Sequence, residues 1–353
     1  MTTIKASARA YETWLKAQIG PDFVKADLDE KHGKMREGPF SFLRATYWRW
    51  AETILDICPE LAGAPEVLAI GDTHLENFGT WRDVEGRLIW GANDFDEAAS
   101  MPYPLDLVRL AASALLARSD DGPTASVICT AILEGYARGL AAPAPLVLEQ
   151  DYKWLRKAVV LAEPDRAAFW EKIDALAPTA IPQRYEDALR AAMPDPAASM
   201  VMSPRSAGTG SLGRPRFVAS GEWRGGPVLR EAKAVVVSAW SLRHSPRTRT
   251  LRIGEIAAGR CRAPDPHYQV SNGIVVRRLS PNSRKIEVKD AADELLSPRM
   301  LKLMGREIAN CHASDPDILP TIQDDLTRRG GDWLRQSAKA AAQSIAREQQ
   351  AFA

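Results

Sequence analysis

Residues 70–97 bring together three side chains that can bind a metal ion: Asp72, Asn77 and Asp94. Asn77 lies five residues after Asp72, and Asp94 follows an apolar stretch as the first residue of Asp-Phe-Asp. Phosphoryl transfer needs a carboxylate that orients and deprotonates the attacking hydroxyl, together with oxygen ligands for Mg²⁺. Asp72 is therefore predicted to be the base, while Asn77 and Asp94 are predicted to hold Mg²⁺.

The sequence around these residues favours a site over an ordinary turn. Asp and Asn are also common in loops, because they cap helices and bond their own backbone. Here, however, an apolar strand is predicted at residues 67–70, and residues 83–86 carry a turn signal between two strand-like pieces. The motif is therefore expected to follow a strand and to surround a tight hairpin.

This segment resembles the catalytic loop and metal loop of the aminoglycoside phosphotransferase and choline kinase group of kinase-like enzymes. The resemblance implies that Asp72 and Asn77 are catalytic. It also implies that Asp94, with Asp96 beside it, binds Mg²⁺. His74 is the rival base, because histidine has the better unperturbed pKa for proton transfer near neutral pH. In kinase-like loops, however, the carboxylate holds the hydroxyl and the histidine packs beneath the loop.

A supporting element of the same group follows the metal loop. Residues 102–107 read Pro-Tyr-Pro-Leu-Asp-Leu and lead into an apolar helix. Kinase-like phosphotransferases have a Pro-x-x-Asp-Leu element here, and its Asp starts a helix that buttresses the site. Asp106 is expected to take this role, with a plain helix cap as the alternative.

A glycine-rich turn is predicted to cover phosphates. Residues 206–218 run from Gly208, Gly210, Ser211 and Gly213 into an alternating strand. Glycine lets backbone N–H groups approach phosphates closely, and a glycine-rich loop covers them in kinases. A dinucleotide-binding turn is the rival interpretation, but its glycines must open a helix, and the residues after Gly213 do not have the character of a helix start. We therefore expect these four residues to contact a nucleotide.

The strand predicted at residues 228–237 supplies a cation for the phosphates, either Arg230 or Lys233. The two are an odd number of positions apart, so a regular strand points them to opposite faces. Kinase-like proteins ordinarily use lysine, which favours Lys233, whereas the shorter spacing from the glycine turn favours Arg230. Glu255 is a candidate ion-pair partner for this cation, and Glu231 is its competitor.

The order of these elements differs from that of an ordinary kinase-like enzyme. The residues before Asp72 show helical spacing at 5–20 and 44–57 and contain no glycine-rich hairpin. Residues 300–313 are predicted to form an amphipathic helix ending in Cys-His-Ala. In kinase-like phosphotransferases a similar helix stands immediately before the catalytic loop. The resemblance therefore implies a circular permutation, which the surface position of domain termini permits.

The implied fold class is α+β: a two-lobed protein-kinase-like fold in circularly permuted order. Residues 1–195 are expected to form the larger, mostly helical catalytic lobe. Residues 196–290 are expected to form the β-rich nucleotide-binding lobe, linked through the proline- and alanine-rich stretch at 194–204. Residues 291–353 are expected to be helices that return to the catalytic lobe. Their tail, from residue 332, should be an alanine-rich helix on the surface or partly frayed.

Six sequence blocks also resemble the bacterial domain of unknown function 2252. They are, in chain order, KMREGPFSFLRATYW (34–48), GDTHLENFG (71–79), NDFDEA (93–98), PLDLVRLAAS (104–113), GTGSLG (208–213) and REAKA (230–234). That family often has Lys-Glu-Ala where this chain has Arg-Glu-Ala at 230–232, so the identity of the phosphate-binding cation stays open. In the first block, the aromatic residues are predicted to be core, and Arg44 is predicted to reach the site.

The composition gives the chain no overall attraction to polyanions. The chain has 353 residues, with 46 Lys and Arg against 45 Asp and Glu. Neither nucleic acid nor an anionic membrane is therefore expected as a partner. The sequence shows no signal peptide or apolar run of transmembrane length, and its four cysteines have no CxxC spacing. A cytoplasmic location is the expectation, and the oligomeric state stays open.

The function expected from these features is ATP- and Mg²⁺-dependent phosphoryl transfer to a hydroxyl group. The partners would be the nucleotide and a small-molecule or protein substrate. Two alternatives remain open at this point: transfer of AMP, as in kinase-like proteins with an inverted nucleotide, and a nucleotide-binding scaffold without catalysis. The presence of all three residues of the predicted metal site favours catalysis over the scaffold.

Overall fold

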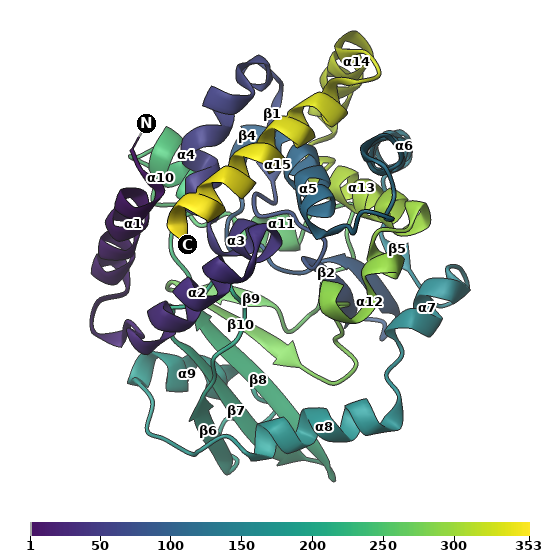
Figure 1. Cartoon of the computed structure of the whole chain (residues 1–353). Coiled ribbons are helices and arrows are strands. Elements are labelled where there is room, and N and C mark those ends of the chain that lie inside the picture. The colour runs from purple at the N-terminus through teal and green to yellow at the C-terminus, as the bar shows by residue number, and fades with distance from the viewer. Residues whose placement is uncertain (1) are drawn as a thin grey trace.

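Helices and strands are concentrated in different parts of the molecule (Figure 1). The computed structural model describes residues 2–353. Most helices gather in one part, and a five-stranded antiparallel sheet forms the other, while the sheet of β1 and β4 lies among the helices. The α+β class predicted from the sequence is confirmed. Within residues 2–353, no helix combines the length and apolar character that crossing a bilayer requires.

The first four helices lie beside the loops that contain Asp72 and Asp94. They are α1 (Ile4–Ile19), α2 (Ala26–Glu37), α3 (Pro39–Ala45) and α4 (Tyr47–Ile57), with the short 3-10 turns η1 (Gly20–Asp22) and η2 (Pro59–Leu61). α1 begins where the side chain of Thr3 accepts a hydrogen bond from the Ala6 amide. The helical spacing noted at 44–57 falls mainly on α4, because the chain leaves helical geometry at Thr46 (φ −127°, ψ 40°), which separates α3 from α4.

Two small sheets carry the loops that contain the predicted catalytic residues. β1 (Glu66–Ala69) pairs with β4 (Ala99–Pro102), and β3 (Leu88–Ala92) lies between β2 (Phe78–Arg82) and β5 (Leu146–Val147). The end of β1 pairs with the start of β4, and the start of β2 pairs with the end of β3. The β1–β2 loop and the β3–β4 loop therefore run side by side between the two sheets.

A bundle of long helices supports these loops. It contains α5 (Pro104–Ala117), α6 (Ala125–Ala141), α13 (Pro298–His312) and α15 (Trp333–Phe352). α6 and α13 cross so closely that a methyl group at Gly135 or Gly305 would collide with the backbone of the other helix. α15 lies against α5 and buries Leu334, Ala338 and Ala341. The C-terminal helix is thus part of the core and not a frayed surface tail.

The larger sheet has the strand order β6-β7-β8-β10-β9. Its strands are β6 (Met200–Pro204), β7 (Arg216–Trp223), β8 (Gly226–Ala234), β9 (Gln269–Ser271) and β10 (Ile274–Leu279). β7 and β8 are joined at Arg224 and Gly225, which both have positive φ, as a two-residue type I′ turn requires. The predicted linker at 194–204 needs correction, because its last five residues pair with β7.

The remaining helices connect the sheet to the helical part. They are α7 (Lys153–Val159), α8 (Glu163–Asp174), α9 (Gln183–Ala192), α10 (Ala239–His244), α11 (Ile253–Ala257), α12 (Val288–Leu295) and α14 (Leu319–Arg329), with the turn η3 (Pro316–Ile318). α8 and α9 lie beside the larger sheet (Figure 1), and α9 contacts β7, β8 and β10. The chain then returns through α12 and α13 to the helical bundle.

Candidate functional site

Asp106 fixes the backbone of the loop that carries Asp72. Its two carboxylate oxygens accept hydrogen bonds from the Ile70 amide (2.8 Å) and the Gly71 amide (2.9 Å). His312, the last residue of α13, lies with Nε2 3.0 Å from the same carboxylate. Asp106 lies inside the first turn of α5 and does not cap it. The structure therefore places Asp106 as a support of the loop, and the alternative of a plain helix cap is wrong.

Asn77 joins the two loops. Its side-chain Nδ2 donates to the backbone carbonyls of Asp72 and Asp94, each at 3.0 Å. Its Oδ1 accepts a hydrogen bond from the Asp94 amide at 3.1 Å. An amide oxygen has two lone pairs, so one direction at Oδ1 remains for a cation. Asn77 thus sets the spacing between Asp72 and Asp94.

Asp72 is oriented by a buried arginine. Arg109, from α5, donates to Asp72 Oδ1 from Nε (2.9 Å) and Nη2 (2.6 Å). Its guanidinium lies over the rings of Tyr47 and Trp50, at 4.9 Å and 5.1 Å. Oδ2 faces the glycine turn, since a Cβ at Gly210 would lie 3.6 Å from it. Burial raises the pKa of Asp72, although Arg109 acts in the opposite direction.

His74 is held as a neutral hydrogen-bond donor. Burial, together with the cations Arg44 and Lys285, keeps the pKa of His74 well below its usual value. Its Nδ1 accepts a hydrogen bond from the Glu76 amide at 3.2 Å, so in the neutral ring the proton is on Nε2. A ring in this state presents a donor to the cleft and is poorly suited to abstract a proton. The arrangement favours Asp72 as the base.

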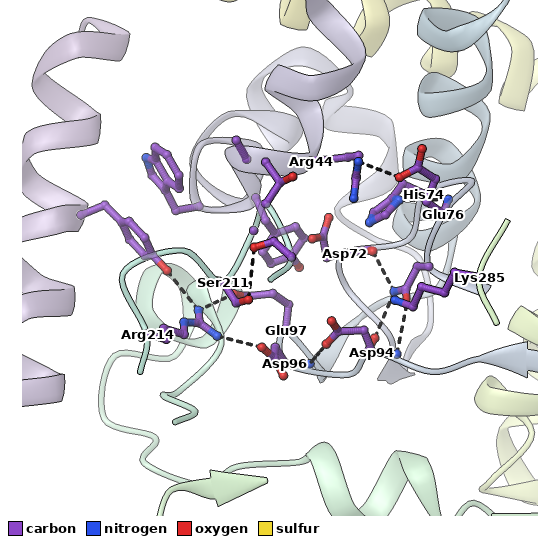
Figure 2. A pocket seen from close by; sticks show the side chains of 18 residues that line it. Arg44, Asp72, His74, Glu76, Asp94, Asp96, Glu97, Ser211, Arg214 and Lys285 are labelled. Carbon is purple, nitrogen blue, oxygen red and sulfur yellow. Dashed lines mark hydrogen bonds and ion pairs between the residues drawn. The ribbon is translucent and has the colours of Figure 1, made fainter. Parts of the chain in front are cut away.

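The turn between β6 and β7 closes over these residues (Figure 2). One cleft is lined by Gly208, Gly210 and Ser211 from this turn and by Asp72, His74, Asn77, Asp94 and Asp96 from the two loops. Gly213 does not line the cleft; its missing side chain leaves space for the ring of Phe23, and its φ of +93° suits glycine. The structure thus brings most of the predicted site residues to one cleft, and Gly213 lies outside this cleft.

The helix α2 holds the glycine turn from outside. The carboxylate of Asp27 accepts hydrogen bonds from the Gly213 amide (3.2 Å) and the Ser206 hydroxyl (2.9 Å). Lys31 donates from Nζ to the Gly210 carbonyl at 3.3 Å. Burial lowers the pKa of Lys31 to about 8. These contacts join residues almost two hundred positions apart, and no local sequence pattern marks them.

The structure separates the two candidate cations on β8. Lys233 forms ion pairs with Asp96 (2.6 Å) and Asp94 (3.4 Å). Arg230 lies on the opposite face, where its Nε donates to the Ala192 carbonyl at 2.9 Å. Arg230 is therefore remote from the cleft, and Lys233 reaches its carboxylates. The opposite orientation follows from the odd spacing of the two residues along a regular strand.

Neither proposed glutamate pairs with Lys233. Glu255 forms an exposed pair with Arg252. Glu231 is fully buried and is surrounded by three arginines: Arg205, Arg216 (2.6 Å) and Arg277 (2.8 Å). Burial alone would raise the pKa of Glu231, but these arginines hold it well below its usual range. The sheet face that carries Lys233 therefore also carries more cations than carboxylates around Glu231.

Two further cations border the cleft and were not predicted as site residues. Arg214 connects Asp96 and Glu97, at 3.1 Å each, to the hydroxyl of Tyr11 at 3.2 Å. Lys285 follows β10 and lines the cleft near Asp94 (Figure 2). Burial lowers the pKa of Lys285 to about 8, although Asp94 opposes this effect. The only sequence signal for Lys285 was its place in a basic cluster, which also suits an exposed loop.

Arg44 from the aromatic block lines the cleft as well, and its Nη1 pairs with Glu76 at 2.6 Å.

The donor set suits Mg²⁺ bound together with phosphates. Burial alone would raise the pKa of Asp94, but Lys233 and Lys285 hold it well below its usual value, so the carboxylate is ionised. Within residues 2–353, no three His, Cys, Asp or Glu side chains gather closely enough to hold a metal by themselves. Mg²⁺ commonly uses one or two carboxylates and completes its shell with substrate phosphates and water. Asp94 and the free direction at Asn77 Oδ1 fit that mode of binding.

Comparison with known proteins finds one family model that matches part of the chain. The model of a family described as an uncharacterized protein conserved in bacteria (DUF2252) matches residues 24–153. The matched segment contains Asp72, Asn77 and Asp94 and ends before the glycine turn. No curated protein and no solved structure matches the chain.

Proposed function

We propose that the protein is an ATP- and Mg²⁺-dependent phosphotransferase that acts on a hydroxyl group. The observation that carries this proposal is the closure of the glycine turn over Asp72, where a Cβ at Gly210 would lie 3.6 Å from Asp72 Oδ2. Because that turn lines the same cleft as Asp94, phosphates beneath it would lie within reach of both a base and a metal ligand.

The order of elements in the larger sheet supports the proposal. The glycine turn joins the first and second strands of the sheet, β6 and β7, and Lys233 lies on the third, β8. Protein kinases have a glycine-rich loop over the phosphates and the phosphate-binding lysine on the third strand. The same arrangement here would place the Lys233 ammonium beside the nucleotide phosphates, displacing its present ion pairs.

A permuted kinase-like fold accounts for the chain order. α13 contacts β1, and its last residue, His312, lies 3.0 Å from Asp106. An unpermuted chain would pass directly from such a helix into the loop that carries Asp72. This proximity supports the permutation, with residues 196–290 as the nucleotide lobe and the rest of the chain as the catalytic lobe.

Each side chain in the cleft has a distinct role in this reaction. Asp72 Oδ2 would accept the proton of the substrate hydroxyl while Arg109 keeps Oδ1 in place. A raised pKa makes the carboxylate a stronger base than an ordinary Asp. Mg²⁺ held by Asp94 and Asn77 would neutralise charge on the phosphates. Lys233 and Lys285 would add positive charge on the two sides of Asp94.

One observation favours AMP transfer as the second candidate. Arg205, Arg216 and Arg277 surround Glu231 on the face of the sheet where Lys233 lies, and Arg216 also donates to Ser211 of the glycine turn at 2.8 Å. Arginines bind phosphate oxygens well, often through two parallel hydrogen bonds. A nucleotide with its terminal phosphates toward these arginines would present its α-phosphate to Asp72.

Transfer from ATP labelled at its γ- or α-phosphate distinguishes these functions. The protein is incubated with Mg²⁺, each labelled ATP and a mixture of bacterial metabolites and proteins, in parallel with Asp94→Ala. We expect γ-label on a product made by the wild type and not by Asp94→Ala. Transfer of the α-label alone would establish AMP transfer instead. Nucleotide binding without transfer of either label would identify a scaffold.

A further inference from the structure

A second cavity lies on the other side of the segment that carries Asp94. It is bordered by the hairpin β2–β3, the helix α11 and the strand β10. Apart from Arg277, no residue that lines this cavity has a role in the phosphoryl or AMP transfer proposed for the cleft.

The two cavities share one short segment of backbone. Asn93 and Phe95 line the second cavity, whereas Asp94 and Asp96 line the cleft. Successive residues therefore face alternate sides. A ligand in the second cavity would touch the residues immediately before and after Asp94.

Two polar atoms in the walls of the second cavity are buried without a partner. Within residues 2–353, Asn93 Oδ1 and Arg262 Nε have no hydrogen-bond partner, and the Arg262 side chain is only 3% exposed. Buried polar groups are almost always hydrogen-bonded in native proteins. An acceptor and a donor on residues that line this cavity thus lack a partner within the protein.

The other contacts of Arg262 fix its position. Its Nη2 donates to the Ala92 carbonyl at 2.6 Å and pairs with Glu307 at 3.2 Å. The guanidinium lies over the ring of Phe95 at 4.5 Å and over that of Trp81 at 5.3 Å. Aromatic and guanidinium faces together stack well on a flat, polarisable ring.

We propose that the second cavity binds a flat heteroaromatic ring of the nucleobase type, and that this ligand regulates the cleft through Asp94. A ring N–H would donate to Asn93 Oδ1, and a ring nitrogen or carbonyl would accept from Arg262 Nε. The regulatory part rests on the proposed nucleotide binding at the cleft. Binding of the ring itself does not.

Calorimetric titration with adenine, hypoxanthine and uracil tests the site. Ala258→Phe fills the mouth of the cavity from an exposed position, and Asn93→Leu removes the acceptor. Ala191→Phe is the matched control, because Ala191 is exposed on α9 away from both cavities. We expect at least one ring to bind the wild type and Ala191→Phe equally, and to bind Ala258→Phe and Asn93→Leu about tenfold more weakly. Absence of binding by all three rings, or equal binding by Ala258→Phe, would overturn the site.

A second titration tests regulation. The affinity of the protein for a non-hydrolysable ATP analogue with Mg²⁺ is measured with and without a saturating concentration of the ring compound. The ring compound should change the affinity for the analogue by the same factor by which the analogue changes the affinity for the ring compound. Unchanged analogue affinity would contradict regulation. Strict competition between the ring compound and the analogue that disappears in Ala258→Phe would show that both bind at one site. That result would overturn the proposal of a separate site. Ring binding without analogue binding would count against the proposed function alone.

Discussion

At the scale of single residues, the proposed reaction depends on how Asp72 is held. Arg109 binds one carboxylate oxygen through two hydrogen bonds and leaves the other facing the glycine turn. A carboxylate fixed in this way is oriented before a substrate arrives, which reduces the entropic cost of reaching the reactive geometry. The neutral, donor state of His74 removes the most obvious competing base.

Replacement of Asp72 separates the role of this carboxylate from that of His74. Asp72→Asn keeps the size of the side chain but removes its basicity, so turnover should fall by roughly 10²–10⁴-fold while nucleotide affinity is retained. His74→Ala should keep most of its turnover. Steady-state kinetics and calorimetry on both variants check this expectation. The roles would have to be exchanged if His74→Ala lost turnover and Asp72→Asn did not.

Lys285 should make nucleotide binding sensitive to alkaline pH. Burial lowers its pKa to about 8, so it loses its proton at a lower pH than an ordinary lysine does. The affinity for ATP with Mg²⁺ should therefore fall as pH rises above about 8. Lys285→Arg should keep its affinity over the same range, and Lys285→Met should bind weakly without this fall. Calorimetry on either side of that pH provides the check, and a wild-type affinity independent of pH would exclude this role.

Some residues of the candidate site were visible in the sequence, and others were not. Asp72, Asn77 and Asp94 stand in one local motif, and the structure gathers them as expected. Arg109 was missed because a single arginine in an apolar helix gives no indication of its partner. Lys31 was missed because its contact with Gly210 depends on tertiary folding alone. Local patterns thus predicted the loops, while the side chains that hold the loops required the fold.

At the scale of elements, β8 determines which of its two cations reaches the cleft. Its pleat directs Lys233 to Asp94 and Asp96 and directs Arg230 to the opposite face. β6 was not predicted because its sequence, Met-Val-Met-Ser-Pro, follows a stretch rich in proline and alanine. Its pairing with β7 makes it a strand, and pairing of this kind is a tertiary effect.

Removal of the ammonium on β8 should weaken nucleotide binding. Lys233→Met should lose roughly 1.5–3 kcal/mol of binding free energy for ATP with Mg²⁺, the range for a hydrogen bond to a charged group. The control is Arg224→Asn, which removes a cation from the exposed β7–β8 turn, where asparagine tolerates the positive φ. Calorimetry should find unchanged affinity in the control. Equal affinity for ATP in both variants would show that Lys233 does not bind the phosphates.

At the scale of the whole molecule, segments from the two ends of the chain build the support of the site. α5 and α6 follow the catalytic loops, whereas α13 and α15 come from the last sixty residues and pack against them. The α+β class was implied by the resemblance to kinase-like enzymes. The close crossing of α6 and α13 was not, since Gly135 and Gly305 have no local signature in their helices.

A matched pair of glycine substitutions tests this packing. Gly305→Ala should destabilise the protein by roughly 1–3 kcal/mol or more, because the added methyl group meets the backbone of α6. Gly33→Ala, in α2, meets no atom within 4 Å and should stabilise the protein by about 0.5–1 kcal/mol. Chemical denaturation gives the free energy of unfolding for both variants. A neutral effect at Gly305 would mean that α6 and α13 lie farther apart.

A crystal structure with a non-hydrolysable ATP analogue and Mg²⁺ tests the central claim most directly. The account predicts that the phosphates lie beneath Gly208 and Gly210, with Mg²⁺ on Asp94 and the transferred phosphorus facing Asp72. The phosphate nearest Asp72 would then distinguish phosphoryl transfer from AMP transfer. An analogue bound elsewhere, with the glycine turn and the carboxylates still in direct contact, would contradict the proposed nucleotide cleft.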